Sequence, residues 1–206
     1  MPPLPLDPVA VFLNIPYDEE FRNLYIAYIV GLYQLGFTPH LSSEMPGGAR
    51  RLDRILDLIQ SCRYSIHDLS RVELSSAPGS APRFNMPLEL GMTITWQILN
   101  PNLHTWFVCE SEPHRLQRSA SDLNGSDPNI HFGTPEGVLS EVRSAFWREG
   151  APSVRRMMEH YRFIDANVDA ILDRNGTSNL FSLAVFKELC WLCSGLSSLL
   201  KQTPRN

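Results

Sequence analysis

Short apolar runs alternate with helical patterns between residues 9 and 147, and this alternation limits the fold more than any other feature of the chain. Strands separated by helices predict a parallel sheet that is covered by helices on both faces. We therefore predict an α/β fold with a doubly wound parallel sheet of about five strands. The predicted strands are residues 9–14, 38–42, 63–67, 104–109 and 129–132, and the predicted helices are about 18–35, 52–59, 86–99 and 135–147.

A second region begins after the tripeptide Gly150-Ala151-Pro152, so we predict an α/β domain over residues 1–150 and a helical part over residues 151–206. Two helical patterns, 153–173 and 179–201, predict a C-terminal helical hairpin. The second helix has too many large apolar residues for an exposed helix, and we expect it to pack on the first domain or to form a homo-oligomer. These residues are Leu180, Leu183, Ala184, Phe186, Leu189, Trp191, Leu192, Leu196 and Leu199.

Composition excludes some partners. The 206 residues carry a net charge of -4, so no general attraction to nucleic acid is expected. No apolar run approaches the roughly 20 residues of a membrane-spanning helix, and the start, MPPLPLDP, lacks the features of a signal peptide. We therefore expect a cytoplasmic protein without membrane association. The four cysteines lack the spacing of a zinc site, so we expect reduced thiols and no bound metal.

Polar residues follow several of the predicted strands. Asn14 follows the first strand, Asp68 to Arg71 follow the third, and Glu110 follows the fourth. Ligands of such sheets bind beyond the carboxyl ends of the strands, so these residues predict a ligand site at that edge.

Glu89, in the stretch PRFNMPLELG, is the strongest candidate for catalysis. We expect it in the first turn of a helix that follows the third strand. Cleavage at a ribosyl C1′ passes through an oxocarbenium-like transition state, which a fixed carboxylate stabilises or attacks. The alternative is that Glu89 only favours the positive end of its helix dipole.

Each of the other candidate residues also has two possible roles, one in ligand binding and one in structure. Ser70, two residues after the strand end at Asp68, can form hydrogen bonds with a ribose or a phosphate, or Asp68 can cap a turn that includes Ser70. Asn14 can bind the ligand or brace the loop after the first strand. Arg50 and Arg51 can neutralise a diphosphate or lie on a surface helix, and the preceding Gly47-Gly48 is too weak a pattern to indicate a phosphate loop.

Three stretches, VFLNIPYDEEF, CRYSIHDLSR and PRFNMPLELG, together resemble the bacterial TIR-like and nucleoside 2-deoxyribosyltransferase-like proteins. In that group a strand ends in Asp-x-Ser, and a helix start of the form Asn-x-x-x-Glu-Leu-Gly follows. The specific part of the match falls on Asp68, Ser70, Asn85 and Glu89 to Gly91, within a resemblance that covers about residues 9–147.

The resemblance implies a flavodoxin-like, TIR-type fold and a nucleotide substrate such as NAD, with no separate cofactor. It implies that Glu89 cleaves the N-glycosidic bond at the nicotinamide ribose, and many such proteins are anti-phage effectors or make nucleotide signals. We expect substrate contacts from Asn14 and Tyr17 on the base or phosphate side, from Asp68 and Ser70 at the ribose hydroxyls, and from the adjacent Arg71 and Asn85.

Two other functions stay open at this point. One is a nucleoside deoxyribosyltransferase, which passes the sugar to another base. The other is a nucleotide-sensing or assembly module that binds without turnover. Release of free nicotinamide, exchange of a base, or tight binding without turnover would distinguish the three.

Overall fold

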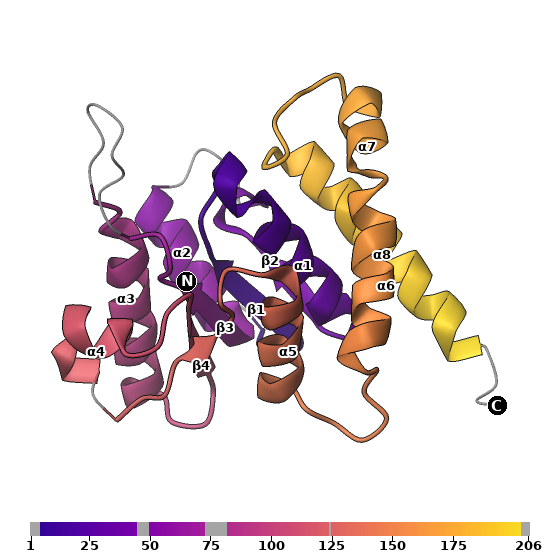
Figure 1. Ribbon diagram of the computed structural model, residues 1–206. Helices are drawn as coiled ribbons and strands as arrows, with labels where there is room; N and C mark the ends of the chain where they lie inside the picture. Colours follow the sequence, from indigo (N-terminus) through magenta and orange to yellow (C-terminus); the bar gives the residue numbers. More distant parts are fainter. Residues whose placement is uncertain (1–4, 45–49, 73–81, 124, 203–206) are drawn as a thin grey trace. The chain divides into compact units, whose positions relative to one another are not determined.

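The computed structural model describes residues 5–44, 50–72, 82–123 and 125–202, and its sheet has five strands in the order β2-β1-β3-β4-β5 (Figure 1). β1, β3, β4 and β5 run parallel to one another. This is the strand order of flavodoxin, so the predicted α/β, flavodoxin-like fold class is confirmed. The strands are β1 Asp7–Asn14, β2 Thr38–His40, β3 Cys62–Asp68, β4 Thr105–Glu110 and β5 Asn129–Ile130.

The last strand is shorter than the sequence predicted. β5 ends at Ile130, and Phe132 has a φ of 53° and is 67% exposed. A left-handed backbone cannot continue a strand, so the prediction of a strand through Phe132 is wrong by two residues.

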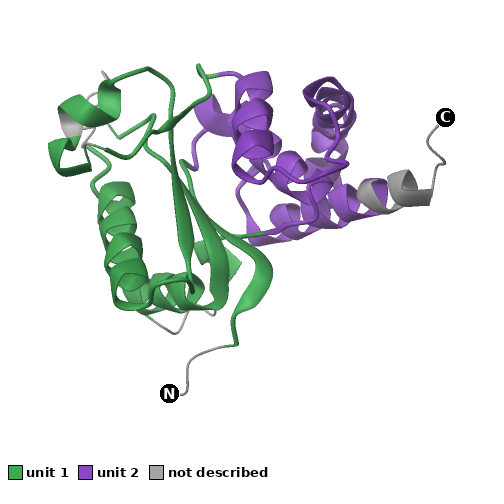
Figure 2. Cartoon of the chain, turned by 90° about the horizontal axis from the view of Figure 1, so that it is seen from below, with its two compact units in different colours: residues 1–16, 39–133 green, residues 17–38, 134–206 purple. Residues whose placement is uncertain are grey.

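The chain divides into two compact units, which are coloured in Figure 2. The first contains residues 1–16 and 39–133, and the second contains residues 17–38 and 134–206. The sheet edge that carries the candidate site belongs to the first unit.

In the first unit, α2 (Arg51–Ser61) and α3 (Asn85–Leu99) pack on β1 and β3, and α3 also packs on β4. One apolar core joins Phe12 of β1 to Ile55 and Ile59 of α2. A second core lies under α3 and the short helix α4 (Arg115–Ser119), where Leu90 packs with Val108. α3 is therefore held on its inner face close to the carboxyl end of β4.

In the second unit, α1 (Arg22–Gln34) is the central helix, and α5 (Pro135–Ala145), α6 (Val154–Asp165) and α8 (Leu183–Gln202) pack against it. All nine residues from 24 to 32 are buried, so this helix is enclosed on every side over that stretch. Asp18 caps the 3-10 turn that leads into α1, because its carboxylate accepts a hydrogen bond from the Phe21 N–H at 3.1 Å.

The C-terminal part has three helices rather than two. The predicted helix 153–173 is interrupted between α6 and α7 (Val168–Arg174), where the Asn167 side chain donates to the Phe163 carbonyl at 2.7 Å. This side chain takes the place of a backbone donor, and such bonds compete with helix continuation.

α8 is buried on one face only. Phe186 and Leu189 are buried as expected, but Trp191 is 76% exposed in the single chain, so its burial in a homo-oligomer stays a prediction. The side chain of Leu199 lies outside the described residues. Across the described ranges, the structure contains no helix with the length and apolar character of a membrane span.

Candidate functional site

The candidate site is built at the carboxyl edge of the sheet in the first unit. The register aligns Asn14 with His67, Asp68 with Cys109, and Glu110 with Ile130. The polar side chains that end β1, β3 and β4 therefore lie along one edge. β1 and β3 are also the neighbours at which the chain order of the sheet reverses, the position where sheets of this kind bind ligands.

Glu89 lies on the inner face of α3, because it is three residues after Met86 and one before Leu90, which are both buried. It belongs to the second turn of the helix rather than to the predicted first turn, so the helix dipole explains less of its placement. The residue is only 3% exposed, and burial raises the pKa of its carboxyl group to about 7.

Arg51 forms an ion pair with the Glu89 carboxylate. Its Nη2 lies 3.8 Å from Glu89 Oε1, and its own side chain is 57% exposed. The Arg51 charge lowers the pKa of Glu89 by less than burial raises it. Among the described residues, no side chain or backbone N–H forms a hydrogen bond with this carboxylate, so it can interact with a substrate.

Asn14 connects the sheet to the start of α3. It is buried at the end of β1, and its Nδ2 lies 2.9 Å from both His67 Nδ1 and the Met86 carbonyl oxygen. Both amide hydrogens are therefore used within the protein. Of the two predicted roles for Asn14, these contacts match the bracing one, and a contact with a ligand stays a prediction.

The bracing continues through a buried relay of hydrogen bonds on β3. Because Asn14 donates to Nδ1 of His67, the proton of His67 must lie on Nε2, which is 2.9 Å from Ser65 Oγ. Ser65 then donates to Nε2 of His104 at 2.8 Å, and His104 Nδ1 donates to the Cys62 carbonyl at 2.8 Å. Burial lowers the pKa of His67 to about 3 and also lowers that of His104, so both imidazoles stay neutral, as this sequence of donors requires.

Asp68 and Ser70 form a closed turn after β3. Asp68 Oδ1 accepts from the Ser70 backbone N–H at 2.9 Å and from its hydroxyl at 2.6 Å. Asp68 Oδ2 lies 3.1 Å from Nε2 of His131, whose Nδ1 accepts from the Gly133 N–H. These contacts are those of a turn cap, and binding of a ribose by either residue stays a prediction.

Glu110 is a second buried carboxylate at the same edge. It is fully buried at the end of β4, and burial raises its pKa to about 7 against the lowering effect of Arg115. Its Oε2 accepts from the Ser111 N–H at 3.2 Å and lies 3.9 Å from Arg115 Nε. Arg115 also donates to the Ser70 carbonyl at 2.9 Å, which ties the β4 end to the turn after β3.

The other predicted site residues are dispersed. Asn85 is exposed at the first position of α3, and Arg71 is half-buried after the Asp68 turn. Tyr17 belongs to the second unit, where its ring packs against those of Tyr25 and Phe181. The Gly47-Gly48 pair lies outside the described residues.

No metal centre is found in the described part of the chain, because no three His, Cys, Asp or Glu side chains gather with the geometry of metal ligands. No family model, curated protein or solved structure matches the chain.

Sequence reasoning placed Glu110 at the edge of the sheet but not in the site, and it missed His67, His131 and the approach of Arg51 to Glu89. One signal was available for the histidines, because both lie within predicted strands and a buried neutral His needs two hydrogen-bond partners. Nothing in the sequence pairs Arg51 with a residue 38 positions later, since that contact depends on how α2 and α3 pack.

Proposed function

We propose that this chain is a nucleotide N-glycosidase that cleaves NAD at the nicotinamide ribose, with Glu89 as the catalytic carboxylate. The observation that carries the proposal is the Glu89 carboxyl group, which is buried at the carboxyl edge of the sheet without a described hydrogen-bond donor. A protein tolerates such a group at a cost in stability, and perturbed carboxylates of this kind concentrate in active sites.

The proposed reaction needs a negative charge beside C1′. The C1′–N bond breaks, and its electron pair leaves with the nicotinamide nitrogen, which loses its positive charge. The ribosyl group becomes an oxocarbenium ion, which the Glu89 carboxylate stabilises. Water then adds to C1′ and gives up a proton to Glu89 or to solvent.

Arg51 fits the phosphate end of the same substrate. It is half exposed at the first residue of α2 and 3.8 Å from Glu89, so a diphosphate bound there would lie next to the reacting sugar. A guanidinium group binds two phosphate oxygens at once. The turn formed by Asp68 and Ser70 and the bracing by Asn14 then act as positioning contacts for the edge of the sheet.

Two further features belong to this proposal. The chain acts in the cytoplasm, because all four cysteines are free thiols in the described structure. It also forms a homo-oligomer through its C-terminal helices, because Trp191 of α8 and Phe163 of α6 are 76% and 49% exposed.

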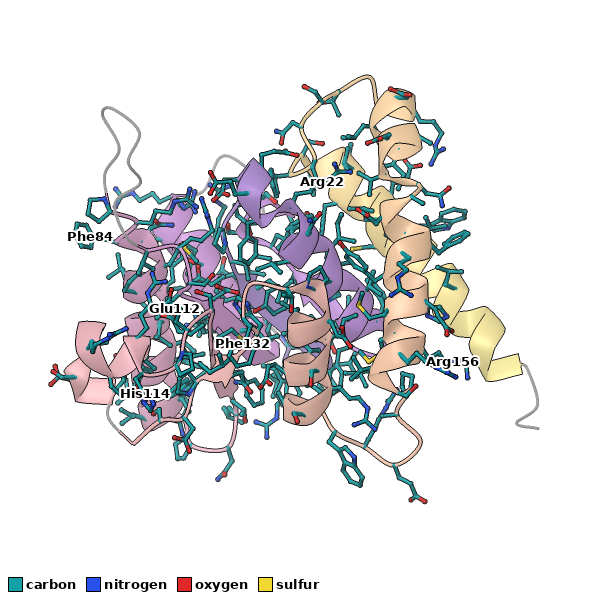
Figure 3. All side chains as sticks on the ribbon, viewed as in Figure 1. Arg22, Phe84, Glu112, His114, Phe132 and Arg156 are labelled. Carbon is teal, nitrogen blue, oxygen red and sulfur yellow. The ribbon has the colours of Figure 1, made fainter. Side chains whose placement is uncertain are left out.

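The test is incubation of the full-length protein with NAD, followed by chromatography for free nicotinamide. Glu89→Gln removes the charge while keeping the shape, and we expect at least about a 100-fold loss of nicotinamide release. The matched control is Glu112→Gln, which changes an exposed carboxylate (Figure 3).

Other results of the same assay exclude the proposal. Base exchange on a deoxynucleoside without hydrolysis of NAD identifies a transferase. Tight binding without turnover identifies a sensing module. Nicotinamide release that is equal in Glu89→Gln and wild type removes Glu89 from the mechanism.

A further inference from the structure

Glu110 has an oxygen atom that no described group uses. Its Oε1 is buried and has no hydrogen-bond partner among the described residues, and the side chain as a whole is 1% exposed. Within the described parts of the chain, the carboxyl group accepts one hydrogen bond, from the Ser111 N–H to Oε2, since Arg115 Nε is 3.9 Å away. Buried carboxyl groups ordinarily have several partners, so this one lacks a donor.

The surroundings of Glu110 define what that donor can be. The Asp68 carboxylate raises the pKa of Glu110 by repulsion, whereas Arg115 and His131 lower it. A further cation is not required, because Arg115 already lies beside the carboxyl group. A neutral hydrogen-bond donor suffices, and it must come from outside the described residues.

A hydroxyl group satisfies this requirement better than other neutral groups. The pKa of Glu110 is about 7, so both the ionised and the protonated forms are present near neutral pH. A hydroxyl donates to the ionised form and accepts from the protonated form, whereas an N–H donor serves only the first. Ribose carries vicinal hydroxyls, and acidic side chains at the carboxyl ends of strands bind ribose hydroxyls in other doubly wound folds.

We propose that Glu110 is a second substrate-binding residue at this edge of the sheet and that its free Oε1 accepts a hydrogen bond from a ribose hydroxyl of the ligand. The inference rests on the proposed function for the identity of the nucleotide. It deepens that function by separating two tasks: Glu89 acts on the reacting carbon, and Glu110 selects ribonucleotides over their deoxy counterparts.

The test combines a change in the protein with a change in the ligand. Glu110→Gln keeps an oxygen for the Ser111 N–H and places an NH2 group where Oε1 was. Glu110→Asp keeps the charge but withdraws the acceptor by one methylene. Binding of NAD and of its four monodeoxyribose analogues is measured by calorimetry in the Glu89→Gln background, in which turnover is blocked. Glu112→Gln is the control for a carboxylate change nearby, and circular dichroism reports whether each variant is folded.

We expect one deoxy analogue to bind about 10- to 100-fold more weakly than NAD when Glu110 is present, the range for loss of a hydrogen bond to a charged group. In Glu110→Gln and Glu110→Asp this difference should shrink to less than about fivefold, because the acceptor for that hydroxyl is already gone. The control should keep the full difference.

Failure of this inference is distinguishable from failure of the glycosidase proposal. The inference is overturned if the loss of affinity of every deoxy analogue relative to NAD is the same with and without Glu110. It is also overturned if NAD, ADP-ribose and AMP all fail to bind. If the coupling is found but the chain with Glu89 intact releases no nicotinamide, the assignment of Glu110 holds and the glycosidase activity does not.

Discussion

Replacement of Glu89 by Gln should stabilise the protein at alkaline pH. The pKa of the Glu89 carboxyl group is raised from 4.5 to about 7, mainly by burial. The folded state therefore binds a proton more tightly than the unfolded state between these two values. The stability that the protonated Glu89 carboxyl group contributes is fully present below pH 4.5 and is lost as the pH rises through 7.

The size of the effect follows from the shift. A rise of the pKa from 4.5 to about 7 corresponds to about 3 kcal/mol of unfolding free energy, which is lost once the carboxyl group is ionised. The amide of Gln is not ionised at either pH. The difference in unfolding free energy between Glu89→Gln and wild type should therefore grow by about 3 kcal/mol between pH 4 and pH 8 in favour of the variant.

Urea unfolding at closely spaced pH values measures this difference, and comparison with wild type at each pH cancels the titration of all other groups. The exposed Glu112→Gln control should show no trend with pH. A flat difference for Glu89→Gln would mean that the carboxylate is not desolvated, and the argument for Glu89 as a strained functional group would fail with it. A stabilised but inactive Glu89→Gln is the result expected of a catalytic carboxylate.

Three further outcomes are expected. Arg51→Ala should move the pH midpoint of activity upward, because Arg51 lowers the pKa of Glu89. Arg50→Ala, at the neighbouring exposed position, should leave the midpoint unchanged. A pH–rate profile of each variant measures the midpoint. Asn14→Ala should destabilise the chain by about 2 kcal/mol or more in urea unfolding, because two buried partners lose their hydrogen bond. Trp191→Ala should lower the mass measured by light scattering if α8 forms the subunit interface, and an unchanged mass would exclude that residue from it.

The sheet could be predicted from the sequence because its strands are local patterns. The run ending at Asn14 is apolar and is bounded by Pro8 and Pro16, and such a run is typical of a buried strand. The errors lie where local signals are weak. Phe132 is an aromatic residue of high strand propensity, but its left-handed backbone ends β5 before it.

The candidate site could be predicted only in outline. The sequence placed Glu89 on a helix after the third strand, but it could not show that this carboxylate lies on the buried face with Met86 and Leu90, because helix phase depends on where the helix begins. It also gave Asp68 two roles that differ only in side-chain contacts. Those contacts, to Ser70 and His131, come from tertiary structure and from a residue 63 positions later.

The buried relay and the Glu89 carboxyl group should respond to pH in separate ranges. His67 has a pKa lowered to about 3, so the stability that depends on its neutral form is fully present above pH 6.5 and is lost as the pH falls toward 3. Asn14, held by His67, keeps its bond to the Met86 carbonyl while the relay is intact, and Met86 is the second residue of the helix that carries Glu89. Activity should therefore fall between pH 8 and pH 6 through protonation of Glu89 in a folded protein. Return to pH 8 should restore it without a refolding step, and the near-ultraviolet circular dichroism should be constant over this range. Loss of the circular dichroism signal in step with activity would show that the two titrations are not separate.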